Sequence, residues 1–122
     1  MADEKPIFWV KSSHKDLKAL PQTPRRDIGF ALSEVQQGEY PDDAKPLTGK
    51  DLKGVYEIRT TDEGNAYRAV YVVNLGEYIY VLHVFQKKSK RGIATPKQVM
   101  DLIRSRLKIA QEHAKELDNE NR

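Results

Sequence analysis

Residues 55–85 read VYEIRTTDEGNAYRAVYVVNLGEYIYVLHVF. Val, Tyr and Ile, which favour strands, dominate three runs in this stretch, at residues 55–60, 66–74 and 78–85. Turn-forming stretches separate the runs, DEGN at 62–65 and LGE at 75–77. This alternation of strand and turn signals predicts two successive hairpins, that is, a three-stranded antiparallel meander.

One strand and two short helices are predicted before the meander. Residues 7–10 (IFWV) fit an inner strand, which we expect to join the meander as a fourth strand. Residues 13–20 begin with a Ser and an Asp three positions apart, which resembles a capping box and predicts a short helix. Thr23–Pro24 resembles an N-cap followed by Pro at the first helical position, and predicts a second helix that ends at Gly38.

Residues 40–49 contain two prolines and a glycine, so we expect a loop there. Thr95–Pro96 predicts the start of a last helix, in which apolar residues recur every three or four positions from Val99 to Leu117 and form one stripe. The expected order is therefore β-α-α-β-β-β-α. We interpret it as an α+β fold, a small twisted antiparallel sheet with the helices packed on one face.

Length and composition predict a single domain over residues 1–122, with a polar tail at about 112–122. The absence of Cys excludes disulfide scaffolds, Cys-based zinc sites and thiol catalysis. The apolar runs are shorter than the roughly 18 residues of a transmembrane helix, and the N-terminus shows no signal-peptide pattern. We therefore expect a soluble cytoplasmic protein without membrane contact.

The positive charge is concentrated in one segment. The net charge is only +3, but residues 87–108 contain eight basic residues and one acidic residue. A basic segment on an otherwise slightly acidic chain is typical of proteins that bind a polyanion. The alternative is an ordinary solvated surface run.

Strand alternation places Glu57 and Arg59 on the sheet face opposite Tyr56, and we expect that face to be open. Arg68 lies within an apolar strand, where a charged side chain is costly unless it is paired or functional. One interpretation is a cross-strand ion pair between Glu57 and Arg68 that only satisfies both charges. The other is a functional cluster in which Arg59, Arg68, Lys87 and Lys88 converge.

Such a cluster suits cleavage of RNA without a metal, because arginines stabilise the negative charge that gathers on the phosphate. Neighbouring cations also depress the pKa of a lysine, which would allow it to act as a base. His83 lies within the last strand, either as a hydrogen-bonded core residue or as the general acid for the leaving 5′-oxygen. We expect no metal site and no cofactor, since neither metal-ligand spacing nor a phosphate-binding loop is present.

Five stretches occur in a characteristic order: KPLTG at 45–49, VYEIR at 55–59, YRAVY at 67–71, LHVFQKKS at 82–89 and TP at 95–96. The ordered set resembles the RelE/ParE superfamily of type II toxins, and within it the phage-derived, HigB-like branch. The resemblance covers roughly residues 7–110. It implies an mRNA endoribonuclease (an mRNA interferase) that cuts translated messages at the ribosome.

The resemblance also implies roles for individual residues. Arg68 matches the strand arginine that contacts the scissile phosphate, and Arg59 matches a basic position one strand away. Lys87 or Lys88 matches the basic residue that follows the last strand. We also expect RNA binding by the basic residues further along this segment, namely Lys90, Arg91 and Lys97. Two departures are visible, because Glu57 stands where RelE has a lysine and no Tyr follows Tyr80.

The partner implied by the resemblance is a cognate antitoxin, a HigA-like helix-turn-helix protein through which the complex would also bind operator DNA. Two other functions stay open. A ParE-like toxin shares the fold but inhibits DNA gyrase, and a non-enzymatic module would use the same basic face only to bind nucleic acid. The basic set around Arg68 favours the nuclease.

Overall fold

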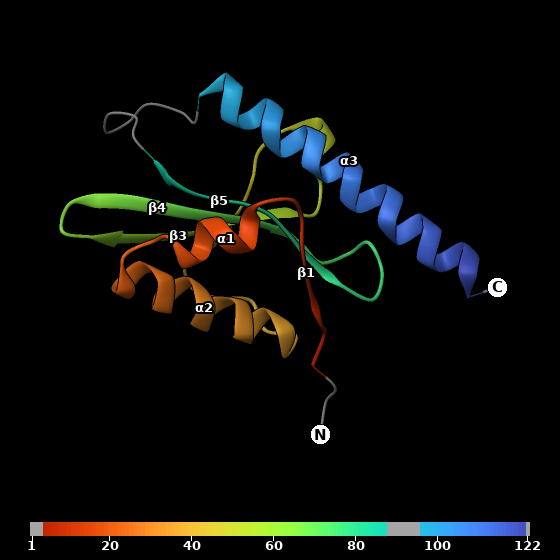
Figure 1. The fold of residues 1–122 in the computed structure, drawn as a ribbon, viewed down its shortest axis with the longest axis horizontal. Helices are drawn as coiled ribbons and strands as arrows, with labels where there is room; N and C mark the ends of the chain where they lie inside the picture. Colours follow the sequence, from red (N-terminus) through yellow and green to blue (C-terminus); the bar gives the residue numbers. More distant parts are fainter. Residues whose placement is uncertain (1–3, 88–95, 122) are drawn as a thin grey trace.

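The computed structural model describes residues 4–87 and 96–121 (Figure 1). The elements in chain order are β1 (Ile7–Trp9), α1 (Ser13–Lys18), α2 (Gln22–Gln36), β2 (Ala44–Pro46), the 3₁₀ helix η1 (Lys50–Leu52), β3 (Val55–Asp62), β4 (Asn65–Val72), β5 (Ile79–Lys87) and α3 (Lys97–Glu120). The α+β class predicted from the sequence is confirmed. No helix within the described ranges is long and apolar enough to cross a membrane.

The sheet has five strands in the order β1-β5-β4-β3-β2. β3, β4 and β5 form the predicted antiparallel meander, which is therefore confirmed. β1 joins the sheet as expected, but it pairs in parallel with β5 and lies at an edge. The predictions of an inner strand and of a purely antiparallel sheet are therefore wrong, and the sheet is mixed.

The hairpin between β3 and β4 fixes the register of the meander. Asp62 pairs with Asn65, and Glu63 and Gly64 between them have φ angles of 50° and 82°. Positive φ at both central residues is typical of a two-residue turn whose twist matches that of the strands, and glycine adopts it without steric cost. This tight turn places Arg59 directly opposite Arg68.

Helices cover both faces of the sheet, so the prediction that they pack on one face is wrong (Figure 1). Apolar residues of α1 and α2 pack against Ile58, Tyr71 and Val81. Apolar residues of α3 pack on the opposite face, in the cluster that contains Val72 and Tyr80. The physical reason is that the central strands are apolar on both sides, which requires cover on both sides.

The predicted loop over residues 40–49 contains β2, whose Ala44 pairs with Ile58. This short strand lies at the sheet edge, where Pro46 is tolerated because the outer side of an edge strand needs no partner. The prediction of a loop without a strand is therefore wrong.

The helix ends also differ by one or two residues from the predictions. α1 begins as expected, but the hydroxyl that donates to Asp16 belongs to Ser12 rather than Ser13. α2 begins at Gln22, one residue before Thr23. Gly38 follows its C-terminus with φ of 86°, as predicted for a helix that stops in a left-handed residue.

Candidate functional site

Two cross-strand rows of side chains lie next to each other on the α3 side of the sheet. The register aligns Glu57, Val70 and His83 in one row, and Arg59, Arg68 and Phe85 in the next. α3 covers this face further along, over Val55 and Val72, so the face is only partly open. In Figure 1 the hairpin end of β3 and β4 extends past the first turn of α3. The row that contains Glu57 lies against the helix, because Val70 belongs to the apolar cluster that contains Ile103 of α3 and His83 contacts Arg106.

Glu57 is the centre of an ion cluster. It is only 3% exposed, and its Oε1 accepts a hydrogen bond from Arg59 Nε at 3.0 Å. Arg68 Nε lies 3.6 Å from the same oxygen. The side chain of Arg59 is 54% exposed and that of Arg68 is 12% exposed. The structure therefore brings both predicted arginines together, and the predicted pair between Glu57 and Arg68 is present as well.

This cluster is not fully satisfied. Glu57 Oε2 and Arg68 Nε are buried and have no hydrogen-bond partner among the described residues. The Nη1 group of Arg68 is used, since it donates to the Tyr67 carbonyl at 3.0 Å. Buried polar atoms in native proteins are nearly always hydrogen-bonded, so these two unpartnered atoms mark the cluster as an unusual feature of the sheet.

The electrostatics of Arg68 follow from its surroundings. Burial lowers its pKa, Glu57 opposes this shift, and the nearby charge of Arg59 adds to it. A guanidinium remains charged at neutral pH despite such a shift. Two like charges directly across a strand pair repel each other, so Glu57 stabilises a local excess of positive charge on this face.

His83 is half-buried and lies one row from Arg68. Its ring stacks on Phe85, with centroids 4.7 Å apart and planes at 15°. Burial and the positive charge of Arg106 lower the pKa of His83 to about 4, against an opposing effect of Asp16. The ring is therefore neutral at neutral pH. It is neither a fully buried core residue nor an imidazolium, and its predicted catalytic role stays a prediction.

The predicted site lysines that the structure describes lie outside the ion cluster around Glu57. Lys87 ends β5 and pairs with Ala66, one row beyond Arg68 on the same face. Lys97 is exposed at the first residue of α3. Three further residues of the predicted site lie outside the described residues, namely Lys88, Lys90 and Arg91.

Sequence reasoning missed one buried cation. Arg106 of α3 is 9% exposed, and its guanidinium contacts His83, Leu82 and Ser12. A signal was present, because Arg106 comes three residues after Ile103 and four before Ala110, within the apolar stripe of the helix.

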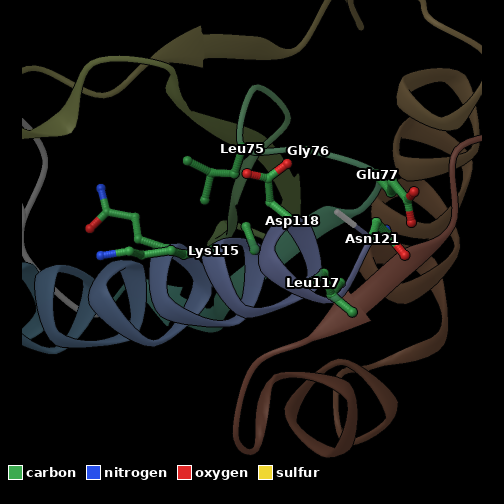
Figure 2. A pocket seen from close by; sticks show the side chains of 9 residues that line it. Leu75, Gly76, Glu77, Lys115, Leu117, Asp118 and Asn121 are labelled. Atoms are coloured by element: carbon green, nitrogen blue, oxygen red, sulfur yellow. The ribbon is translucent and has the colours of Figure 1, made fainter.

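The hollows of the surface mostly lie away from the cluster. Figure 2 shows one of about 320 Å³, lined by the β4–β5 connection at Leu75, Gly76 and Glu77 and by the last turns of α3. It includes none of the predicted site residues. A second hollow, of about 590 Å³, is bordered by Ser12, Leu102 and Arg106. No three or more His, Asp or Glu side chains within residues 4–87 and 96–121 gather to hold a metal ion.

Comparison with known proteins gives one informative match. The model of a family described as "Phage derived protein Gp49-like (DUF891)" matches residues 15–108, which is more than half of the chain and includes both rows of the site. A search of curated proteins finds no match. The chain therefore belongs to the phage-derived Gp49-like family, a RelE-like family associated with the toxins of toxin–antitoxin systems.

Proposed function

We propose that this protein is an mRNA endoribonuclease, the toxin of a type II toxin–antitoxin system of the HigB-like branch, acting without a metal on translated messages at the ribosome. The observation that carries the proposal is the cluster of Arg59, Glu57 and Arg68 on the partly open sheet face. Membership of a toxin-associated family supports it independently.

The cluster suits attack of a ribose 2′-hydroxyl on the adjacent phosphate. In this reaction a bond forms between the 2′-oxygen and phosphorus, and the bond from phosphorus to the 5′-oxygen breaks. Negative charge builds up on the phosphate oxygens, where guanidinium donors stabilise it most strongly. Arg68 is held by its neighbours and largely buried, so it is oriented before substrate binds.

A base must take the proton of the 2′-hydroxyl. We propose Glu57 for this role because its carboxylate contacts both arginines. Its Oε2 is buried in the free protein, so the proposal requires that RNA binding exposes this atom. We therefore assign the base to Glu57 in preference to a lysine. The leaving 5′-oxygen takes a proton from water, and the products are a 2′,3′-cyclic phosphate and a 5′-hydroxyl.

The proposed partner is a cognate antitoxin, a HigA-like helix-turn-helix protein that also binds operator DNA. The exposed guanidinium of Arg59 offers an acidic segment a direct contact with the site. We expect the product of the neighbouring gene to co-purify with this chain and to restore growth. If it neither binds nor rescues growth, and no other small protein does, the toxin assignment loses its biological support.

The test of the nuclease uses a synthetic RNA and a translated message in a cell-free system. We expect cleavage to leave a 5′-hydroxyl end, to persist in EDTA, and to disappear when a single 2′-deoxynucleotide replaces the residue before the cut. Arg104→Met serves as the matched control, since Arg104 is paired with Asp51 on the surface of α3. If a folded Arg68→Met variant cleaves as fast as the Arg104→Met control, the proposed active site is wrong.

One observation favours a second candidate, the non-enzymatic nucleic-acid-binding module. Glu57 is close to both arginines, as it would be if it only neutralised them. The same experiment separates the two, because a binding module retards RNA in a gel without producing new ends.

A further inference from the structure

A chain of hydrogen bonds with one fixed direction links α1, the turn before it, α3 and β5. The Ser12 hydroxyl donates to the Asp16 carboxylate at 2.8 Å, and Ser12 Oγ accepts from Arg106 Nη2 at 3.2 Å. Nη1 of Arg106 donates to the Leu82 carbonyl at 2.9 Å and lies 3.3 Å from His83 Nδ1. A guanidinium has donors and no acceptor, so the direction of every link is determined.

This direction fixes the protonation of His83. Because Arg106 can only donate, Nδ1 of His83 must accept, and it carries no proton in this arrangement. A neutral imidazole then has its single proton on Nε2, on the other side of the ring. The low pKa of His83, caused by burial and by Arg106 and opposed by Asp16, agrees with a ring that stays neutral at neutral pH.

The local backbone supports the same contact. The register passes from Val70 opposite His83 to Tyr71 opposite Val81, so Leu82 is the extra residue of a β-bulge. Bulges turn a side chain away from its regular direction and release backbone groups from the ladder. Here the Leu82 carbonyl accepts a hydrogen bond from Arg106 Nη1, which connects the helix to the strand next to His83.

Arginine is required for this geometry. A buried guanidinium is costly unless its donors are used, and here both terminal nitrogens are bound to different elements. The planar fork reaches β5 and the turn at Ser12 at the same time, whereas the single ammonium of a lysine reaches one of them. If position 106 served only to pack α3 against the sheet, an apolar residue would be sufficient there.

We propose that Arg106 is a positioning residue that holds His83 as a neutral imidazole, whose Nε2–H donates a hydrogen bond to the scissile phosphate. The proposal rests on the proposed nuclease function of this sheet face. His83 lies one row from Arg68, about 7 Å along the strand, which is within the span of one phosphodiester group and its ribose. His83 then stabilises developing charge as a fixed donor, and does not transfer its proton to the leaving oxygen.

The first experiment reads the tautomer without any substrate. The full chain is labelled with ¹⁵N-histidine, and the His83 signals are assigned with His83→Gln. We expect a single Nε2–H tautomer for wild type at pH 7. In Arg106→Met we expect both tautomers and a titration closer to the ordinary pKa of histidine, with Arg106→Lys intermediate and the surface control Arg104→Met unchanged.

Two outcomes overturn the positioning role. One is a wild-type spectrum with the proton on Nδ1 or on both nitrogens at pH 7, which needs no variant and decides even if Arg106→Met does not fold. The other is a folded Arg106→Met protein whose His83 keeps the wild-type tautomer and titration.

The second experiment separates a fixed donor from a general acid. We expect Arg106→Met to lower kcat at least tenfold with little change in KM, and His83→Gln, which keeps an N–H near the Nε2 position, to retain more activity than His83→Met. A wild-type rate that falls tenfold per pH unit above about pH 6.5, with the fall absent in His83→Gln, overturns the donor role. If no RNA is cleaved although the Nε2–H tautomer is present, the proposed nuclease function and the phosphate contact are wrong. The hydrogen bond by which Arg106 fixes the tautomer of His83 would still be supported.

Discussion

Arg59 and Arg68 face each other across β3 and β4, and Glu57 Oε1 lies 3.0 Å from Nε of the first and 3.6 Å from Nε of the second. Two like charges in direct register destabilise a strand pair, so this arrangement depends on the carboxylate beside it. A phosphate contacting both arginines would add the second negative charge that the cluster lacks. The same relationship therefore explains how the two arginines are tolerated without a ligand, and it predicts affinity for an anion.

Glu57→Gln tests the structural half of this relationship. The substitution keeps the shape of the side chain and removes its charge, which leaves Arg68 buried beside Arg59 without a counter-ion. We expect a loss of about 1–3 kcal/mol in the free energy of unfolding, measured by urea denaturation. The matched control is Asp51→Asn, which breaks an exposed pair with Arg104 and should change stability by less than about 1 kcal/mol. Equal effects of the two substitutions would contradict the dependence on Glu57.

Arg68→Lys tests the functional half. Lysine retains the charge but lacks the planar fork that can bind two phosphate oxygens. We expect single-turnover cleavage of a synthetic RNA to slow by about 10²–10³-fold, the usual cost of removing one donor to a transition-state oxyanion. Binding of the uncleavable 2′-deoxy analogue should weaken much less. If the analogue loses affinity by the same factor, Arg68 contributes to binding and not to the chemical step.

The meander could be predicted because its signals are local. β3, β4 and β5 each have a run of strand-forming residues, and the turns between them contain glycine where a positive φ is needed. The face on which α3 packs could not be predicted from its own stripe, because a stripe shows that a helix packs and not where. The available signal was in β5, where Ile79 to Leu82 form an unbroken run without a charged residue, as is typical of a strand covered on both faces. All four residues are buried in the structure.

In the site, too, local features could be predicted from the sequence and long-range contacts could not. Arg59 and Arg68 could be placed on one face because strand alternation is a local rule, although α3 partly covers that face. Arg106 was missed because its partners are distant in the chain, Ser12 by 94 positions and His83 by 23. The charge of Arg106 looked like one more member of a basic segment. Only tertiary structure distinguishes a buried guanidinium from an exposed one.

The basic segment after β5 makes a separate prediction about RNA binding. Lys90 and Arg91 lie outside the described residues, and the sequence predicts that they contact phosphates. Each such contact with a single strand contributes about 0.7 to the slope of log affinity against log salt. We therefore expect the double substitution Lys90→Gln with Arg91→Gln to reduce that slope by about 1.4. The control removes two lysines of α1, Lys15→Gln with Lys18→Gln, which lie on the helix of the opposite face and should leave the slope unchanged. An unchanged slope in the first variant would assign the segment to ordinary solvated surface.

His83 predicts a loss of stability in mild acid. Its pKa is lowered to about 4 in the folded protein, mainly by burial and then by Arg106, while the unfolded chain has the ordinary value near 6.5. Between these two values the unfolded state binds more protons than the folded state, so stability falls as the pH falls. The contribution of His83 is complete above about pH 6.5 and decreases progressively toward pH 4. Urea midpoints measured across this range should decline more steeply for wild type than for His83→Gln, which cannot titrate. All other titratable groups are common to the two proteins, so the comparison isolates the contribution of His83. Parallel declines of the two proteins would show that the pKa of His83 is not lowered in the folded protein. The contact between Arg106 and Nδ1 would then not be maintained in solution.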